Sequence, residues 1–172
     1  MLKTGLVSLL IGLTLSWSIQ AATTLYLDDR LDLLVLDGKK VAPSLLRGAG
    51  SLELESGLHQ LVVRIESPQN SSPQATAAEI ITVDTQRIRR LHFTLTPGSG
   101  TDTSLPQIGL RNEKGHPIDV VRDRLQHAQA DIADCMELAT LQYNRSQGIA
   151  AREIFAQGQH PLNCPTPTSL QK

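Results

Sequence analysis

The sequence predicts a mainly β fold, in which an N-terminal antiparallel sandwich is followed by a C-terminal helical segment. Three observations predict this α+β class. Between residues 24 and 96, short runs of alternating apolar and polar residues are separated by turn signals, as is typical of strands in a sandwich. Beyond Pro117, apolar residues recur every three or four positions, which is the period of a helix. The 172 residues are enough for one domain with an appended segment.

The composition excludes one broad class of partner. The chain has 16 Lys and Arg residues against 17 Asp and Glu residues, so its formal net charge is −1, and aromatic residues make up only 3%. A protein that binds nucleic acid needs a basic stripe or a platform of aromatic rings. We therefore expect no nucleic acid partner.

The first 21 residues have the composition of a signal peptide. A short positive segment ends at Lys3, an apolar run follows at Leu6–Leu15, and small residues lead to Ala21 and Ala22. This order is typical of a cleavable export signal, with cleavage after either alanine. The apolar run is too short to span a bilayer, which takes about 20 residues. The sequence therefore predicts export to the periplasm without stable membrane insertion.

The predicted sandwich domain, residues 22–111, begins with a hairpin. Leu31–Leu36 is an apolar strand that ends in Asp37-Gly38, two residues that tolerate the positive φ angles of a tight turn. Lys39–Val41 starts the return strand. The sequence thus places a two-residue turn between two antiparallel strands.

The later strands of the sandwich are predicted from alternation. In the strand Leu58–Glu66, Leu61 and Val63 share one face, while Gln60 and Val62 share the other. The remaining expected strands are 51–55, 79–83, 88–96 and 106–111. The last of them is closed by a turn at residues 112–115.

The second predicted unit, residues 112–172, is a helical segment with a tethered tail. A second short helix is expected over Ile149–Ala156, and prolines make the tail after it extended. The apolar stripe of the main helix consists of Ile118, Val121, Leu125, Ala128, Ile132, Cys135, Ala139 and Gln142.

The chain has two cysteines, Cys135 and Cys164. An exported chain meets an oxidising compartment, so a disulfide between them is the expected state. It would close a loop of about 30 residues and pin the tail across the apolar stripe of the helix. A redox-active pair or a metal site has no support, because there is no C-x-x-C motif and no cluster of His partners.

The sequence contains no motif of a known catalytic site, so we expect a protein that is not an enzyme and has no cofactor or metal. Three weak patterns in the sequence could instead indicate a metal or phosphate site. Asp123, His127 and Asp131 would share one helix face and could hold a divalent metal, but a solvated polar face is the favoured interpretation. An acidic group at Asp28, Asp29 and Asp32 lacks the spacing of a calcium loop. The segment 48–51, Gly-Ala-Gly-Ser, lacks the context of a phosphate loop and is interpreted as a turn.

Arg87, Arg89 and Arg90 form the most distinctive charge feature of the sequence, beside the strand 91–96. Charges at the start of a strand commonly keep a sheet edge from pairing with other chains. The alternative is that these arginines bind an acidic partner. Both interpretations stay open at this point.

One long stretch resembles a known family. The sequence reads D-L-L-V-L-D-G-K-K-V at Asp32–Val41, S-L-L-R-G-A at Ser44–Ala49 and H-Q-L-V at His59–Val62. In these motifs the chain resembles the YccT-like family of periplasmic proteins, strongly over residues 1–66 and more weakly to about residue 150.

The resemblance implies a function that the composition does not. The family includes inhibitors of curlin polymerisation in enteric bacteria and has no established catalytic residues. The resemblance therefore implies an exported periplasmic protein, not an enzyme, whose partners are curli subunits. A structural or envelope-stress module that binds another periplasmic protein is the alternative.

Overall fold

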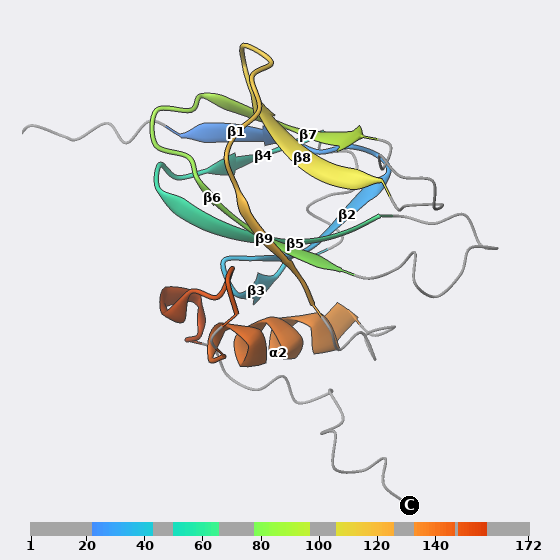
Figure 1. The fold of residues 1–172 in the computed structure, drawn as a ribbon, viewed down its shortest axis with the longest axis vertical. Coiled ribbons are helices and arrows are strands. Elements are labelled where there is room, and N and C mark those ends of the chain that lie inside the picture. The colour runs from blue at the N-terminus through green and yellow to red at the C-terminus, as the bar shows by residue number, and fades with distance from the viewer. Residues whose placement is uncertain are drawn as a thin grey trace, which may run out of the picture.

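The computed structural model describes residues 22–42, 50–65, 78–96, 106–125, 133–146 and 148–157. The predicted signal peptide lies outside these ranges. The described residues form two β-sheets and one helical layer (Figure 1). This confirms the mainly β fold with a C-terminal helix. None of the described helices is long and apolar enough to cross a membrane.

The first sheet has four strands in the order β4-β1-β7-β8. Its strands are β1 (Thr23–Tyr26), β4 (Ser51–Leu54), β7 (Arg90–Thr96) and β8 (Gln107–Asn112). Neighbours β4–β1 and β7–β8 are antiparallel, whereas β1 and β7 run parallel. The sandwich is therefore antiparallel except at this one pair, which the sequence did not predict.

The second sheet has five strands in the order β3-β2-β5-β6-β9, and all of its pairs are antiparallel. Its strands are β2 (Leu31–Leu36), β3 (Lys39–Lys40), β5 (Leu58–Ile65), β6 (Glu79–Asp84) and β9 (Val121–Arg124). Asp37 and Gly38 form the turn between β2 and β3, with φ angles of 51° and 76°. This confirms the predicted hairpin, because both turn residues adopt the left-handed conformation that such a turn requires.

The main core lies between the two sheets. Alternating residues from both sheets fill it, including Leu61 and Val63 of β5 and Leu91 and Phe93 of β7. Leu61 and Val63 share one face of their strand, as the alternation predicts, and this face points into the core. Burial of this apolar surface is the main force that holds the two sheets together.

A second core lies between the five-stranded sheet and the helical layer. The layer consists of α2 (Ala133–Asn144) and the 3-10 helix η2 (Glu153–Phe155), and it covers the outer face of that sheet (Figure 1). Val62 of β5 packs there with Met136 of α2. The sheet is thus buried on both faces at its centre. The second helix is shorter than the predicted 149–156.

The prediction of a helix through Val121 is wrong. Residues 121–124 form strand β9, which pairs with β6 at the edge of the five-stranded sheet, and α2 begins only at Ala133. The spacing of Ile118, Val121 and Leu125 fits a helix. If these residues were helical, however, the side of β6 that faces β9 would have unpaired backbone N–H and C=O groups. Strand β9 therefore belongs to the five-stranded sheet, although it lies beyond residue 111, where the predicted sandwich domain ends.

Candidate functional site

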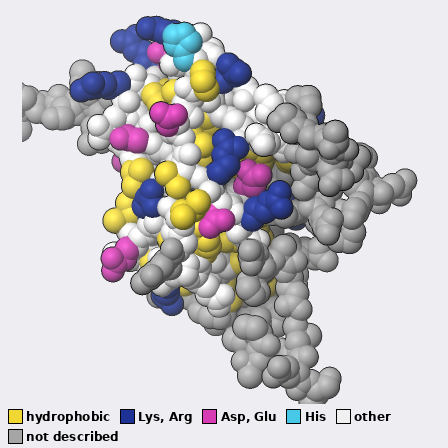
Figure 2. All heavy atoms as spheres, in the orientation of Figure 1, with side chains coloured by type: hydrophobic (Ala, Val, Ile, Leu, Met, Phe, Trp, Pro, Cys, Tyr) yellow, Lys and Arg dark blue, Asp and Glu magenta, His cyan; other side chains and the backbone are white. Residues whose placement is uncertain are grey.

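Basic side chains gather at one end of the four-stranded sheet. Arg87 and Arg89 lie in the turn between β6 and β7, Arg90 is the first residue of β7, and all three are exposed. Arg87 adopts a φ of 66°, in the left-handed region. Figure 2 shows Lys and Arg side chains gathered at the top of the view, where the turn after β8 projects in Figure 1. The structure therefore places the three predicted arginines together on an accessible surface.

Strand pairing brings a second basic segment to the same end. β7 and β8 are antiparallel, with Leu91 opposite Asn112 and His92 opposite Arg111, so the start of β7 lies beside the end of β8. The turn after β8 adds Lys114 and His116, both exposed. We call this set of residues the basic end: Arg87, Arg89, Arg90, Arg111, Lys114 and His116.

One carboxylate lies within the basic end. Glu113 is exposed, and its pKa is held below the ordinary value by its own backbone N–H, together with those of Arg90 and Arg89. The Arg111 guanidinium is oriented by a hydrogen bond of 2.7 Å that it donates to the carbonyl of Gly115. The basic end therefore presents five permanent cations and one carboxylate, a set of groups suited to binding anions.

Sequence reasoning found only half of the basic end. Arg87, Arg89 and Arg90 are conspicuous because they are close in the sequence, whereas Arg111, Lys114 and His116 follow the polar segment 97–104. The signal that could have found them is the pairing of strands 88–96 and 106–111 as a hairpin. Such a pairing places the start of one strand beside the end of the other.

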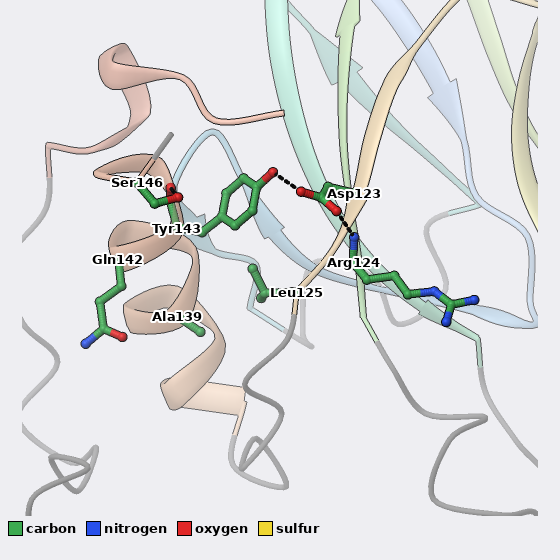
Figure 3. A pocket seen from close by; sticks show the side chains of 7 residues that line it. All are labelled: Asp123, Arg124, Leu125, Ala139, Gln142, Tyr143 and Ser146. Atoms are coloured by element: carbon green, nitrogen blue, oxygen red, sulfur yellow. Dashed lines mark hydrogen bonds between the residues drawn. The ribbon is translucent and has the colours of Figure 1, made fainter. Parts of the chain in front are cut away.

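A cavity of about 380 Å³ lies between β9 and α2 (Figure 3). Its lining residues are Asp123, Arg124, Leu125, Ala139, Gln142, Tyr143 and Ser146. In Figure 3 the Tyr143 ring extends from the helix toward Asp123, and the Tyr143 hydroxyl donates a hydrogen bond of 2.6 Å to Asp123 Oδ2. The other Asp123 oxygen accepts a bond of 2.8 Å from the backbone N–H of Arg124.

Tyr143 links the helix to the edge strand and to the segment after the helix. Its hydroxyl oxygen also accepts a hydrogen bond of 3.1 Å from the backbone N–H of Ala150. Burial raises the pKa of Tyr143 to about 12, and the bond to Asp123 acts in the same direction. A phenol that stays protonated far above neutral pH cannot serve as a general base. The contact instead ties α2 to the edge strand β9.

The weak metal patterns do not form a site in the described part of the chain. Asp123 lies on a strand, so it cannot share a helix face with His127 and Asp131, which lie outside the described residues. No group of three His, Cys, Asp or Glu side chains in the described ranges could hold a metal ion.

The acidic group at residues 28–32 is engaged by arginines. Asp28 forms an ion pair of 2.8 Å with Arg30, and Asp32 forms one of 3.0 Å with Arg64. The hydrogen bond from Arg30 lowers the pKa of Asp28. In the glycine-containing segment, Gly48 and Ala49 lie outside the described residues, and Ser51 begins strand β4.

Cys135 lies on α2 and is buried. The described residues include no free cysteine. Cys164 lies outside the described residues, so its pairing with Cys135 stays a prediction. The buried position agrees with the expectation that Cys135 belongs to the apolar stripe of the helix.

Comparison with known proteins shows the family to which the chain belongs. A family model described as "Uncharacterized protein conserved in bacteria (DUF2057)" matches residues 24–171. The UPF0319 protein YccT of Salmonella schwarzengrund is 38% identical over 167 residues, which cover 90% of this chain and 74% of that protein. YccT of Shigella flexneri serotype 5b is 38% identical over 166 residues, with the same coverage of both chains.

A third relative gives the same result. A UPF0319 protein of Enterobacter sp. strain 638 is 36% identical over 165 residues, covering 90% of this chain and 74% of its own. No solved structure matches the chain. The matches extend through both sheets and the helical layer, well beyond the motifs at residues 32–62. The chain therefore belongs to the YccT-like family, UPF0319.

Proposed function

We propose that this protein is exported to the periplasm, is not an enzyme, and restrains the polymerisation of curli-type amyloid subunits. The family resemblance implies the subunit. The observation that carries the physical argument is the outer strand β8, at the edge of the four-stranded sheet. Its end at Arg111 is bridged to Pro117. Among the described residues, no strand pairs with the outer side of the first half of β8, Gln107–Gly109.

An unpaired strand edge can accept one strand from another chain. The added strand satisfies backbone N–H and C=O groups on both partners, as in other complexes formed by strand addition. Amyloid subunits present such strands, and fibres grow at their ends by this same pairing. A protein that occupies the growing strand without offering a second edge would slow fibre growth.

The fold protects its other edges against self-assembly. β3 has only two residues and β4 has four. β9 also has four residues, Val-Arg-Asp-Arg, and three of them are charged. Short edges and charged side chains are the features by which natural sheets avoid pairing with further copies. These features support a protein that binds one chain and does not propagate the stack.

The test is a polymerisation assay with purified mature protein, begun at residue 22. Curlin polymerisation is followed by thioflavin fluorescence with the protein present at a substoichiometric ratio. We expect a longer lag phase. Gln107→Lys places a charge on the exposed start of β8 and should shorten the lag again, because an edge lysine opposes strand pairing.

The matched control is Gln157→Lys, an equivalent change at an exposed residue of the helical layer. This control should retain the full effect on the lag. Polymerisation kinetics that are unchanged by the wild-type protein would contradict the proposed function. An equal loss of effect in both lysine variants would contradict the assignment to β8.

A second candidate is a structural or envelope-stress module that binds a different periplasmic protein through the helical layer. The specific observation is that Ile149 and Ile154 are 68% and 60% exposed. Capture from a periplasmic extract should then enrich one protein, and Ile149→Lys together with Ile154→Lys should abolish its capture. An unchanged capture profile would contradict this candidate.

A further inference from the structure

We propose that the basic end binds an extended acidic segment of a partner polypeptide. The proposal deepens the proposed function, on which it relies for the partner being a polypeptide, by naming the chemistry of the segment that is recognised. It is carried by a juxtaposition that the strand pairing creates. Two exposed turns, far apart in the sequence, meet at one end of the four-stranded sheet.

The pairing places the cations on one surface. Thr24 of β1 lies opposite Arg90, Tyr26 lies opposite His92, and His92 lies opposite Arg111. Alternate residues of a strand share a face, so Arg90, His92 and Arg111 lie on the outer face of this sheet. The rings of Tyr26 and His92 stack there, with centroids 4.4 Å apart and planes at 5°. Arg111 thus lies beside His92 on the neighbouring strand, and Arg90 lies two residues before His92 on β7, so both arginines neighbour His92 of the ring pair.

The cations of the basic end take part in no ion pair in the described part of the chain. Ion pairs there join Arg30 to Asp28, His59 to Asp37 and Arg64 to Asp32, and none of them includes a residue of the basic end. The Glu113 carboxylate in the same turn is held chiefly by backbone N–H groups, and Lys114 has only a smaller effect on its pKa. An incoming anion therefore does not have to displace an existing ion pair.

Four of the five permanent cations at the basic end are arginines. The planar guanidinium binds a carboxylate through two parallel hydrogen bonds, which favours a carboxylate partner with fixed geometry. An extended segment presents alternate side chains on one side, about 6.6 to 6.8 Å apart. Arg90 and Arg111 are diagonal neighbours on β7 and β8, about 7–8 Å apart, so carboxylates at alternate positions could reach both.

Two other anionic partners fit less well. Exposed large apolar side chains of the described chain are Leu58, Val121, Ile149 and Ile154, and none of them lies in the two turns. A surface that docks on a membrane commonly adds such side chains to its cations. Nucleic acid is disfavoured by the low aromatic content and the near-zero net charge.

The test measures binding of a short fluorescein-labelled peptide of alternating Glu and Thr by fluorescence anisotropy. The triple variant Arg89→Gln, Arg90→Gln and Arg111→Gln should bind at least about tenfold more weakly, because each lost cation removes a charge-assisted contact. Binding by the wild-type protein should also weaken from about 50 mM to about 300 mM salt, since exposed charges are screened. A peptide with Gln in place of Glu should not bind.

The matched control removes the same number of charges elsewhere. Arg122→Gln, Arg124→Gln and Arg145→Gln change exposed residues of β9 and of the segment after α2, and should retain affinity. Circular dichroism and thermal melting of both triple variants verify that they fold. Equal loss of affinity in both variants would overturn the proposal, because it would mean a nonspecific effect of net charge.

Three further outcomes distinguish the partner and separate this proposal from the proposed function. Binding to phosphatidylglycerol vesicles without binding to the acidic peptide would overturn the proposal in favour of a membrane surface. Loss of peptide binding in the triple variant, together with a curlin lag that the wild-type protein does not lengthen, supports the basic end and contradicts the proposed function. A lengthened lag that the triple variant preserves in full contradicts the basic end and leaves the proposed function standing.

Discussion

His59 is a buried residue whose two ring nitrogens both face hydrogen-bond acceptors. Nδ1 lies 2.8 Å from Asp37 Oδ2, and Nε2 lies 2.7 Å from the carbonyl oxygen of Glu55. Only the doubly protonated imidazolium can donate to both. The hydrogen bond to Asp37 accordingly raises the pKa of His59, against the opposing effect of burial. The ring joins the β2–β3 turn to the start of β5.

This arrangement predicts a pH-dependent stability. Because the folded-state pKa of His59 is raised, its contribution is fully present below the unfolded value of about 6.5 and is lost as the pH rises through the folded value. The free energy of unfolding, measured by urea denaturation across neutral to alkaline pH, should therefore fall more steeply for wild type than for His59→Gln. His116→Gln, at an exposed histidine, should keep the wild-type slope. Parallel curves for wild type and His59→Gln would refute the assignment.

Gln60 and Asn144 form a buried amide pair between β5 and α2. Each donates to the other's carbonyl oxygen at 2.7 Å, and their side chains are 0% and 4% exposed. Alternation correctly places Gln60 on the face opposite Leu61. It does not reveal that a helix covers that face, because a polar residue in such a position is ordinarily exposed to solvent.

Replacing one amide side chain of this pair should lower the free energy of unfolding by more than replacing both. Asn144→Leu leaves a donor and an acceptor of Gln60 buried without that partner, and we expect a loss of about 1–3 kcal/mol in the free energy of unfolding. Gln60→Leu combined with Asn144→Leu should recover part of it, since no amide of the pair is then left alone. Chemical denaturation of the single and double variants gives the coupling energy. Simple additivity of the two changes would argue against the pair.

At the scale of elements, the β2–β3 hairpin also supports the helical layer. A Cβ atom added at Gly38 would lie 2.5 Å from the carbonyl oxygen of Phe155, which follows from close packing of η2 against the turn. Gly38 also has a positive φ, so this one residue meets two requirements that only glycine satisfies. The D-G signal in the sequence indicates the turn but not the contact with η2.

Gly38→Ala should therefore destabilise the protein by about 1–3 kcal/mol, from backbone strain and from displacement of η2. The matched control is Gly50→Ala, because nothing lies within 4 Å of a Cβ atom at that position. Thermal melting of both variants checks the expectation. Similar melting temperatures for the two would contradict the contact.

The contact between Tyr143 and Asp123 joins α2 to β9. Tyr143→Phe leaves Asp123 Oδ2 and the N–H of Ala150 without this partner, and we expect a loss of about 1–3 kcal/mol. The Tyr143 pKa of about 12 lies above its unfolded value of 10.0. The contribution of the phenol is therefore present below pH 10 and is lost as the pH rises toward 12. The difference between the ultraviolet titrations of wild type and Tyr143→Phe measures the pKa of the Tyr143 phenol. A Tyr143 phenol that titrates at its ordinary value would contradict its hydrogen bond to Asp123.

The limits of the sequence prediction are clearest at β9. The strands with long alternating patterns, such as β5 and β7, were predicted with their correct inward faces. Residues 121–124 are too short to distinguish a strand from a turn of helix, and the choice is made by the exposed edge of β6. The same dependence on a distant strand explains why only half of the basic end could be predicted, since Arg111 reaches Arg90 only through the β7–β8 register.

At the scale of the whole molecule, the predicted disulfide would fasten the C-terminal segment to the helical layer. A bond between Cys135 and Cys164 closes a loop of about 30 residues, for which the chain-entropy model gives about 3.5 kcal/mol. Protein purified without reductant should have no free thiols, and reduction should lower the midpoint of urea denaturation. Cys164→Ser should reproduce the effect of reduction. Two free thiols in the unreduced protein would exclude the bond.

The parallel pair β1–β7 has a consequence for how the chain folds. β1 is the first described strand, yet it lies in the interior of its sheet, between β4 and a strand encoded far downstream. The four-stranded sheet is therefore complete only after β7 and β8 have been delivered, long after β1. Contacts between distant parts of a chain also form slowly. The pairing of β1 with β7 should therefore be a late step in folding.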